Sequence, residues 1–130
     1  MIQIKNTEGQ VLYEDSTKNS FEELWLEKIN LDRANLQGCY MPSAYFSECS
    51  LRGASFRKAD LRDADFHDCD LNSADFTESD MENVTIDGCD LHNTKFHSVD
   101  LQNADIDWLI IDDADLEDVL LPSHRSPAYM

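Results

Sequence analysis

The chain has 130 residues and a formal net charge of −17, from 27 acidic and 10 basic side chains. Such a charge repels DNA, RNA and anionic lipid, so we expect no direct nucleic-acid binding and no membrane binding; it favours a basic protein partner, or serves only as a solvated surface. The length fits one domain. Because no stretch resembles a signal peptide or a membrane span, we expect a cytoplasmic protein with four reduced cysteines.

The N-terminal segment differs in pattern from the rest of the chain. Residues 1–14 alternate in places between apolar and polar side chains, with a glycine-containing turn between the two halves, which predicts a β-hairpin. Ser20 and Glu23 then have the spacing of a capping box, and apolar residues at helical spacing follow. We therefore expect a short amphipathic α-helix at 21–29, with Trp25 in the core.

From residue 31 to residue 121 the sequence repeats with a period of five. The residue two places before each apolar centre is usually small, Asp often stands directly before it, and two polar residues usually follow. On an α-helix, residues five apart would point in steadily changing directions, and on a straight strand they would point alternately to opposite faces. All the centres can therefore be buried only if the chain bends once per repeat. This predicts a solenoid over 31–121 and a tail over 122–130. The 19 successive centres are Leu31, Leu36, Met41, Phe46, Leu51, Phe56, Leu61, Phe66, Leu71, Phe76, Met81, Ile86, Leu91, Phe96, Leu101, Ile106, Ile111, Leu116 and Leu121.

The repeat resembles that of the pentapeptide repeat proteins, whose consensus is Ala-Asp/Asn-Leu/Phe-x-x. It is seen most clearly in Ala59-Asp60-Leu61-Arg62-Asp63 and Ala74-Asp75-Phe76-Thr77-Glu78. The resemblance covers about 90 residues and implies an all-β solenoid, a right-handed quadrilateral β-helix with four repeats in each 20-residue coil. It further implies that the centre and the small residue point inward, and that residues 1–30 form an N-terminal hairpin and helix cap.

In such a coil, residues 20 apart stack into columns at the strand spacing of ~4.8 Å. Two inward columns follow: one of phenyl rings and one of thiols. The thiols either pack as small apolar side chains or form a metal or redox site; their spacing does not match Cys-x-x-Cys and no histidine joins them, which favours packing. The rings are those of Phe56, Phe76 and Phe96, and the thiols those of Cys49, Cys69 and Cys89.

Outward columns of aspartate suggest either Ca²⁺ binding or hydrogen bonding to local backbone N–H groups. No spacing matches a calcium loop, and local bonding suits a chain that bends every five residues, so we favour the second. His67, His92 and His97 fall on three different faces. We expect no metal, no cofactor and no catalytic residue, and hence a non-enzymatic protein. The candidate acidic surface comprises Asp60, Asp80, Asp100, Asp70, Asp90 and Asp105.

Charge and apolar groups are unevenly placed along the solenoid. Residues 35–62 carry four basic and two acidic side chains, whereas residues 63–121 carry 18 acidic side chains and Lys95 alone. This asymmetry is either drift or a polarity used for binding. In the last coil, the register places Trp108, Ile110 and Leu120 outward, where apolar groups need cover. That cover is either the C-terminal tail or a second copy, which would give a homodimer through the C-terminal coil.

Two functions fit this pattern. The first is a rigid acidic protein–protein interaction module whose partner the sequence does not name. The alternative is a DNA-mimicking regulator of a DNA-binding enzyme such as DNA gyrase, which the resemblance implies because some acidic family members protect or inhibit gyrase. About 4.5 coils span roughly 22 Å, whereas a turn of DNA spans ~34 Å, so mimicry predicts an end-to-end dimer.

Overall fold

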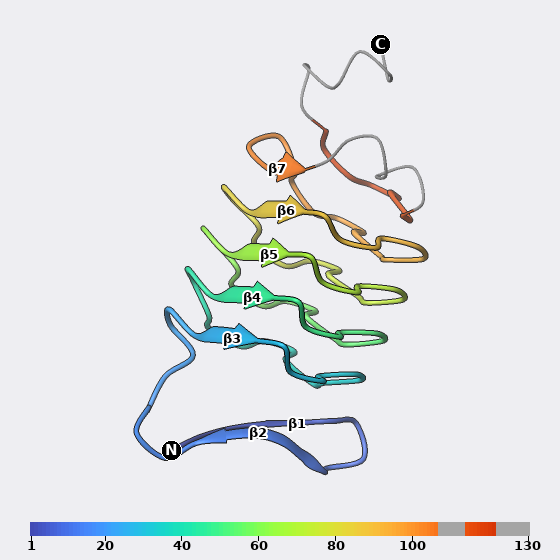
Figure 1. The fold of residues 1–130 in the computed structure, drawn as a ribbon. Coiled ribbons are helices and arrows are strands. Elements are labelled where there is room, and N and C mark those ends of the chain that lie inside the picture. The colour runs from blue at the N-terminus through green and yellow to red at the C-terminus, as the bar shows by residue number, and fades with distance from the viewer. Residues whose placement is uncertain (107–113, 122–130) are drawn as a thin grey trace.

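The computed structural model describes residues 1–106 and 114–121. These residues form a stack of four-sided coils with an N-terminal hairpin at one end, below the coils in Figure 1. All the elements in this part of the chain are strands, so the predicted all-β solenoid is confirmed. No helix that is long and apolar enough to cross a membrane occurs in it. The hairpin strands are β1 (Ile2–Lys5) and β2 (Val11–Asp15), and the coil strands are β3 (Trp25–Glu27), β4 (Tyr45–Ser47), β5 (Asp65–His67), β6 (Thr85–Asp87) and β7 (Asp105–Ile106).

The coils are in register with a step of 20 residues. Strands β3 to β7 form one parallel sheet in chain order, and Phe46 pairs with Phe66 within it. The other sides of the coil keep the same step through isolated bridges, such as Asp60 with Asp80. Four repeats of five residues therefore make one coil, as predicted.

Most of the described repeats bend the chain through a residue with positive φ. In one repeat the N–H of Ala64 donates to the carbonyl of Leu61 at 3.0 Å, and Asp63 inside this turn has a φ of 61°. Among the described residues, fourteen non-glycine residues have a positive φ, and the intervals between them are all five or a multiple of five. The regular bend is the physical reason why an odd repeat length can keep every centre on the inside of the coil.

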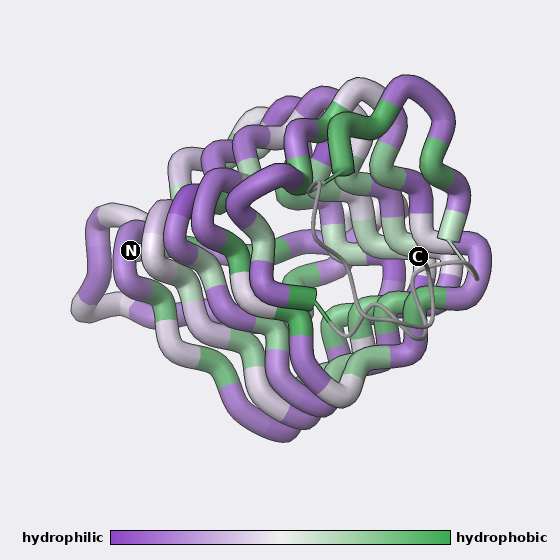
Figure 2. The backbone as a smooth tube through the Cα atoms, turned by 90° about the horizontal axis from the view of Figure 1, so that it is seen from above, coloured by the Kyte–Doolittle hydropathy of each residue, from purple (hydrophilic) through white to green (hydrophobic). Residues whose placement is uncertain are grey.

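The interior is packed by aromatic ladders, and hydrophobic residues alternate with hydrophilic ones along every coil (Figure 2). The ring of Phe76 stacks on Phe56 at 4.8 Å and on Phe96 at 5.3 Å, measured between centroids, which confirms the predicted phenyl column. A second ladder runs beside it, with Phe46 stacked on Phe66 at 5.0 Å. The two ladders meet edge to face, for example at 5.5 Å between Phe56 and Phe66, an arrangement that aromatic quadrupoles favour.

The predicted hairpin is confirmed, and it covers one end of the stack. Ile2 and Ile4 of β1 are buried and belong to the continuous apolar core. The hairpin is also hydrogen-bonded to the first coil, because the N–H of Asn35 donates to the carbonyl of Lys5 at 2.8 Å. The end of the solenoid is therefore closed by paired backbone as well as by apolar side chains.

The predicted helix at 21–29 is wrong. This segment is a further pair of repeats: Phe21 and Leu26 continue the period of five, and strand β3 pairs with β4 on the next coil. Glu23 and Lys28 have φ values of 57° and 55°, which an α-helix does not allow. Trp25, expected in the core, is 61% exposed.

Candidate interaction surface

The six aspartates of the candidate acidic surface lie on three sides of the solenoid. Asp60, Asp80 and Asp100 form one column along one side, because each is 20 residues from the next and the coils keep that register. The paired residues Asp70 and Asp90 are half a coil away from that column, on the opposite side. Asp105, which completes the set, lies on the strand side opposite Thr85 of β6. One flat partner surface therefore reaches only one of these columns at a time.

Most of these carboxylates are held by their own backbone. An aspartate oxygen accepts the N–H of the residue two places later, at 3.2 Å for Asp80 and at 2.9 Å for both Asp90 and Asp100. The predicted local hydrogen bonding is thus confirmed. These bonds fix the direction in which each carboxylate points.

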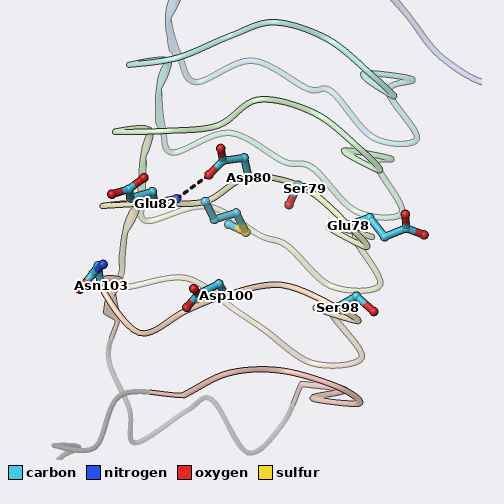
Figure 3. Close-up of a pocket in the computed structure, with 8 residues that line it drawn as sticks. Glu78, Ser79, Asp80, Glu82, Ser98, Asp100 and Asn103 are labelled. Atoms are coloured by element: carbon cyan, nitrogen blue, oxygen red, sulfur yellow. Dashed lines mark hydrogen bonds between the residues drawn. The ribbon is translucent and has the colours of Figure 1, made fainter.

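The column on the side of Asp80 borders a hollow of about 410 Å³ (Figure 3). Asp80 and Asp100 come from successive coils and line it together with Glu78, Glu82 and Asn103. The lining is polar, with several carboxylates and no cation among the residues that form it. A hollow of this composition suits a cationic side chain better than an apolar ligand.

The predicted basic residues of the early coils do not form a free positive surface. Arg52 pairs with Asp70 at 3.0 Å and Arg57 with Asp75 at 3.1 Å, in both cases across the step to the next coil. Arg62 pairs with Asp60. The positive charges therefore neutralise nearby aspartates, and the exposed charge along the described coils is predominantly negative.

The candidate apolar patch is described only in part. Leu120 is 56% exposed, as its outward register position predicts, and it pairs with Asp100 on the preceding coil. Trp108 and Ile110 lie outside the described residues. An end-to-end contact through this patch therefore stays a prediction.

An exposed aromatic pair lies on the strand side of the first coils, and the sequence reasoning missed it. The indole of Trp25 stacks on the ring of Tyr45 with 4.0 Å between centroids and 20° between planes, and its Nε1 donates to Glu27 at 2.8 Å. The signal was present in the sequence, because Trp25 and Tyr45 are 20 residues apart and each directly precedes a centre.

The thiols of Cys49, Cys69 and Cys89 form the predicted buried column. The N–H of Cys69 donates to the sulfur of Cys89 at 3.4 Å, and the Cys69 thiol donates to the carbonyl of Phe46 at 3.3 Å. The contact with the Cys69 thiol and burial both raise the pKa of Cys49. The three thiols are buried and face inward, which is the behaviour expected of structural cysteines.

Taken together, the features define a class of protein: a parallel β-solenoid with four five-residue sides per coil, closed at one end by a hairpin and bearing fixed carboxylates outside. The chain belongs to the pentapeptide repeat family. A model described as a pentapeptide repeat region matches residues 17–86, and one described as pentapeptide repeats (8 copies) matches residues 69–108 and 79–118. The first match begins before residue 31, in agreement with the early repeats found in the structure.

A solved structure of a similar protein has the same fold, a right-handed quadrilateral β-helix. A trypsin-treated form of QnrB1, described as a plasmid-mediated fluoroquinolone resistance protein, is 24% identical with a TM-score of 0.64; the match covers 78% of this chain and 50% of QnrB1, so the chain spans half the length of that protein. Rfr23 from the cyanobacterium Cyanothece 51142 is 15% identical (TM-score 0.37, 78% and 86% coverage). A pentapeptide repeat protein of the Arabidopsis thaliana thylakoid lumen is 24% identical (TM-score 0.34, 71% and 69% coverage). No curated protein sequence gives a match.

Proposed function

We propose that this protein is a non-enzymatic, rigid interaction module that binds a basic protein partner through the carboxylate column of Asp60, Asp80 and Asp100, in which Asp80 and Asp100 offer the open carboxylates because Arg62 already pairs with Asp60. The observation that carries the proposal is the fixed direction of these carboxylates. Each accepts the backbone N–H two residues later, at 3.2 Å for Asp60 and Asp80 and at 2.9 Å for Asp100.

Fixed acceptors favour association in two ways. Because the carboxylates are already oriented, binding orders few side chains and costs little conformational entropy. The column also repeats at ~4.8 Å, so a basic segment lying along the coil axis meets several carboxylates in succession. The net charge of −17 speeds the encounter with a positive partner, an effect that salt weakens.

The test uses two matched double variants. Asp80→Asn with Asp100→Asn neutralises the column, and Asp70→Asn with Asp90→Asn removes the same charge from the opposite side. A partner captured with the native protein and then purified is titrated against all three by calorimetry at two salt concentrations. We expect about tenfold weaker binding for the first pair and a smaller loss for the second. Equal affinity for all three proteins would contradict the proposal.

A DNA-mimicking regulator is the second candidate, and one observation favours it. Acidic columns on opposite sides of the rod, Asp60 to Asp100 and Asp70 to Asp90, resemble two rows of phosphates on one cylinder. The four steps from β3 to β7 span roughly 19 Å, less than the ~34 Å of one DNA turn. Mimicry therefore needs two copies joined at their C-terminal coils, where Leu120 is exposed.

Two measurements separate the candidates. Light scattering after size exclusion gives the association state, and Leu120→Ser tests whether the C-terminal patch contributes to it. A supercoiling assay with DNA gyrase shows whether the protein changes the activity of an enzyme that holds DNA. A protein that stays monomeric at high concentration and leaves supercoiling unchanged rules out mimicry, and the interaction module remains testable by the aspartate variants.

A further inference from the structure

Three side chains with metal-binding atoms converge at the side of the last described coils. His97 projects from one coil, and Asp115 and Glu117 come from the next, 18 and 20 residues further along the chain. The backbone holds the two segments in register, since the N–H of Phe96 donates to the carbonyl of Asp115 at 3.0 Å. The solenoid step brings the three groups together, although they are far apart in sequence.

The cluster brings one imidazole nitrogen and two carboxylate oxygens close to one another. The Nε2 atom of His97 lies 2.8 Å from Oδ2 of Asp115 and 3.9 Å from Oε2 of Glu117, and the three ligand atoms lie within 4.8 Å of one another. Nε2 is buried, and among the described residues it has no hydrogen bond that meets the geometric criteria, although the Asp115 carboxylate lies 2.8 Å away. Two ligands at the tetrahedral angle on an ion ~2.1 Å away would be ~3.4 Å apart, between the 2.8 Å of the His97–Asp115 contact and the 3.9 Å of the His97–Glu117 contact, so small side-chain rotations would complete the site.

We propose that His97, Asp115 and Glu117 form a binding site for a divalent metal ion of the zinc type. One imidazole nitrogen and two carboxylate oxygens are a ligand set that zinc accepts, with water in the fourth position, whereas magnesium and calcium prefer oxygen alone. The two carboxylates balance the charge of the ion.

A second histidine has carboxylate neighbours that do not point toward a common ligand position. His67 also has two carboxylate neighbours, but they approach different ring nitrogens: Asp68 is 3.5 Å from Nε2 and Asp87 is 3.2 Å from Nδ1. One ion cannot bind both nitrogens of a ring, so these groups do not make a common site. His67 is therefore a matched control, with similar chemistry and the wrong geometry.

The experiment measures zinc binding to the untagged, reduced full chain by calorimetry and equilibrium dialysis. We expect one equivalent of zinc, and an affinity at least about tenfold lower in His97→Gln and in Glu117→Gln. His67→Gln and Glu82→Gln, which remove the same groups elsewhere, leave the affinity unchanged. Glu117 has a largely exposed side chain, and circular dichroism confirms that each variant is folded.

Cobalt provides an independent readout of the ligands. A cobalt spectrum without a thiolate charge-transfer band supports nitrogen and oxygen ligands, and that spectrum is lost in His97→Gln. The proposal is overturned if the native protein binds no zinc at millimolar concentration, if His97→Gln binds as tightly as the native protein, or if the thiolate band appears. Tighter binding of calcium than of zinc also overturns it.

Discussion

The guanidinium of Arg62 donates two hydrogen bonds to the carboxylate of Asp60, from Nε at 2.9 Å and from Nη2 at 2.8 Å. The same side chain reaches Asp80 on the next coil, with 4.0 Å between Nε and the carboxylate. Arg62 therefore neutralises one end of the aspartate column, and its hydrogen bonds lower the pKa of Asp60. The column carries its uncompensated charge further along the coils, at Asp100.

This pair predicts a pH-dependent contribution to stability. The pKa of Asp60 in the folded protein lies below its usual 3.8, so the stabilisation is present above that value and is lost as the pH falls through the folded pKa. Arg62→Gln should lower the urea midpoint at pH 7 by a small amount, because the pair is only partly buried, and the difference from the native protein should vanish at a pH below the folded pKa of Asp60. The control is Lys58→Gln, which removes a cation without a described ion pair. An effect of Arg62→Gln that is equal at both pH values would contradict the prediction.

The phenyl ladder predicts where a cavity is most costly. Phe76 is fully buried and contacts rings on the coils before and after it, so Phe76→Ala should lower the free energy of unfolding by about 3–5 kcal/mol. Phe76→Leu should cost less, because it keeps part of the volume. Chemical denaturation measures both against Trp25→Ala, a truncation of an exposed aromatic residue. A Phe76→Ala cost no larger than that of Trp25→Ala would show that the ladder is not the core.

The positive φ angles predict a gain in stability from glycine. Lys58 has a φ of 58°, a conformation that costs a residue with a Cβ about 1 kcal/mol or more and costs glycine almost nothing. Lys58→Gly should therefore raise the urea midpoint, although the greater freedom of the unfolded chain offsets part of the gain. Gln37→Gly, at the preceding position of the same turn on the coil before, should lower it. The opposite order would mean that strain at the bends is negligible.

The buried thiols predict a simple reactivity pattern. Cys49, Cys69 and Cys89 are buried, and the pKa of Cys69 is raised to about 12, because the Cys89 thiol and burial outweigh the opposing effect of the Cys49 thiol. Cys39 is half-buried, and burial raises its pKa as well. The hydrogen bond with the Cys69 thiol lowers the pKa of Cys89, but burial keeps reagents away from its sulfur. A thiol reagent at pH 8 should therefore react first with Cys39 and far more slowly with the other three, whereas unfolded, unreduced protein should yield four thiols. Loss of the fast reaction in Cys39→Ser checks the assignment, and fewer than four thiols on unfolding would indicate a disulfide.

The periodicity of the sequence predicted most of the fold. The period of five required one bend per repeat, and the bend is seen at Asp63 and its counterparts. The step of 20 placed Phe56, Phe76 and Phe96 in one stack, and their rings are parallel. The start of the solenoid was misplaced, because over nine residues the spacing of Phe21 and Trp25 suits a helix as well as a repeat.

The sequence by itself determined the coil, its register and the inward or outward direction of each side chain, because these follow from a strict local repeat. Only the tertiary structure decided which side chains meet between coils. Arg52 forms an ion pair with Asp70, and Trp25 stacks on Tyr45. His97 lies close to Asp115 and Glu117. These contacts depend on side-chain rotamers and on distances of a few ångströms between neighbouring coils. A five-residue sequence repeat specifies neither the rotamers nor the distances.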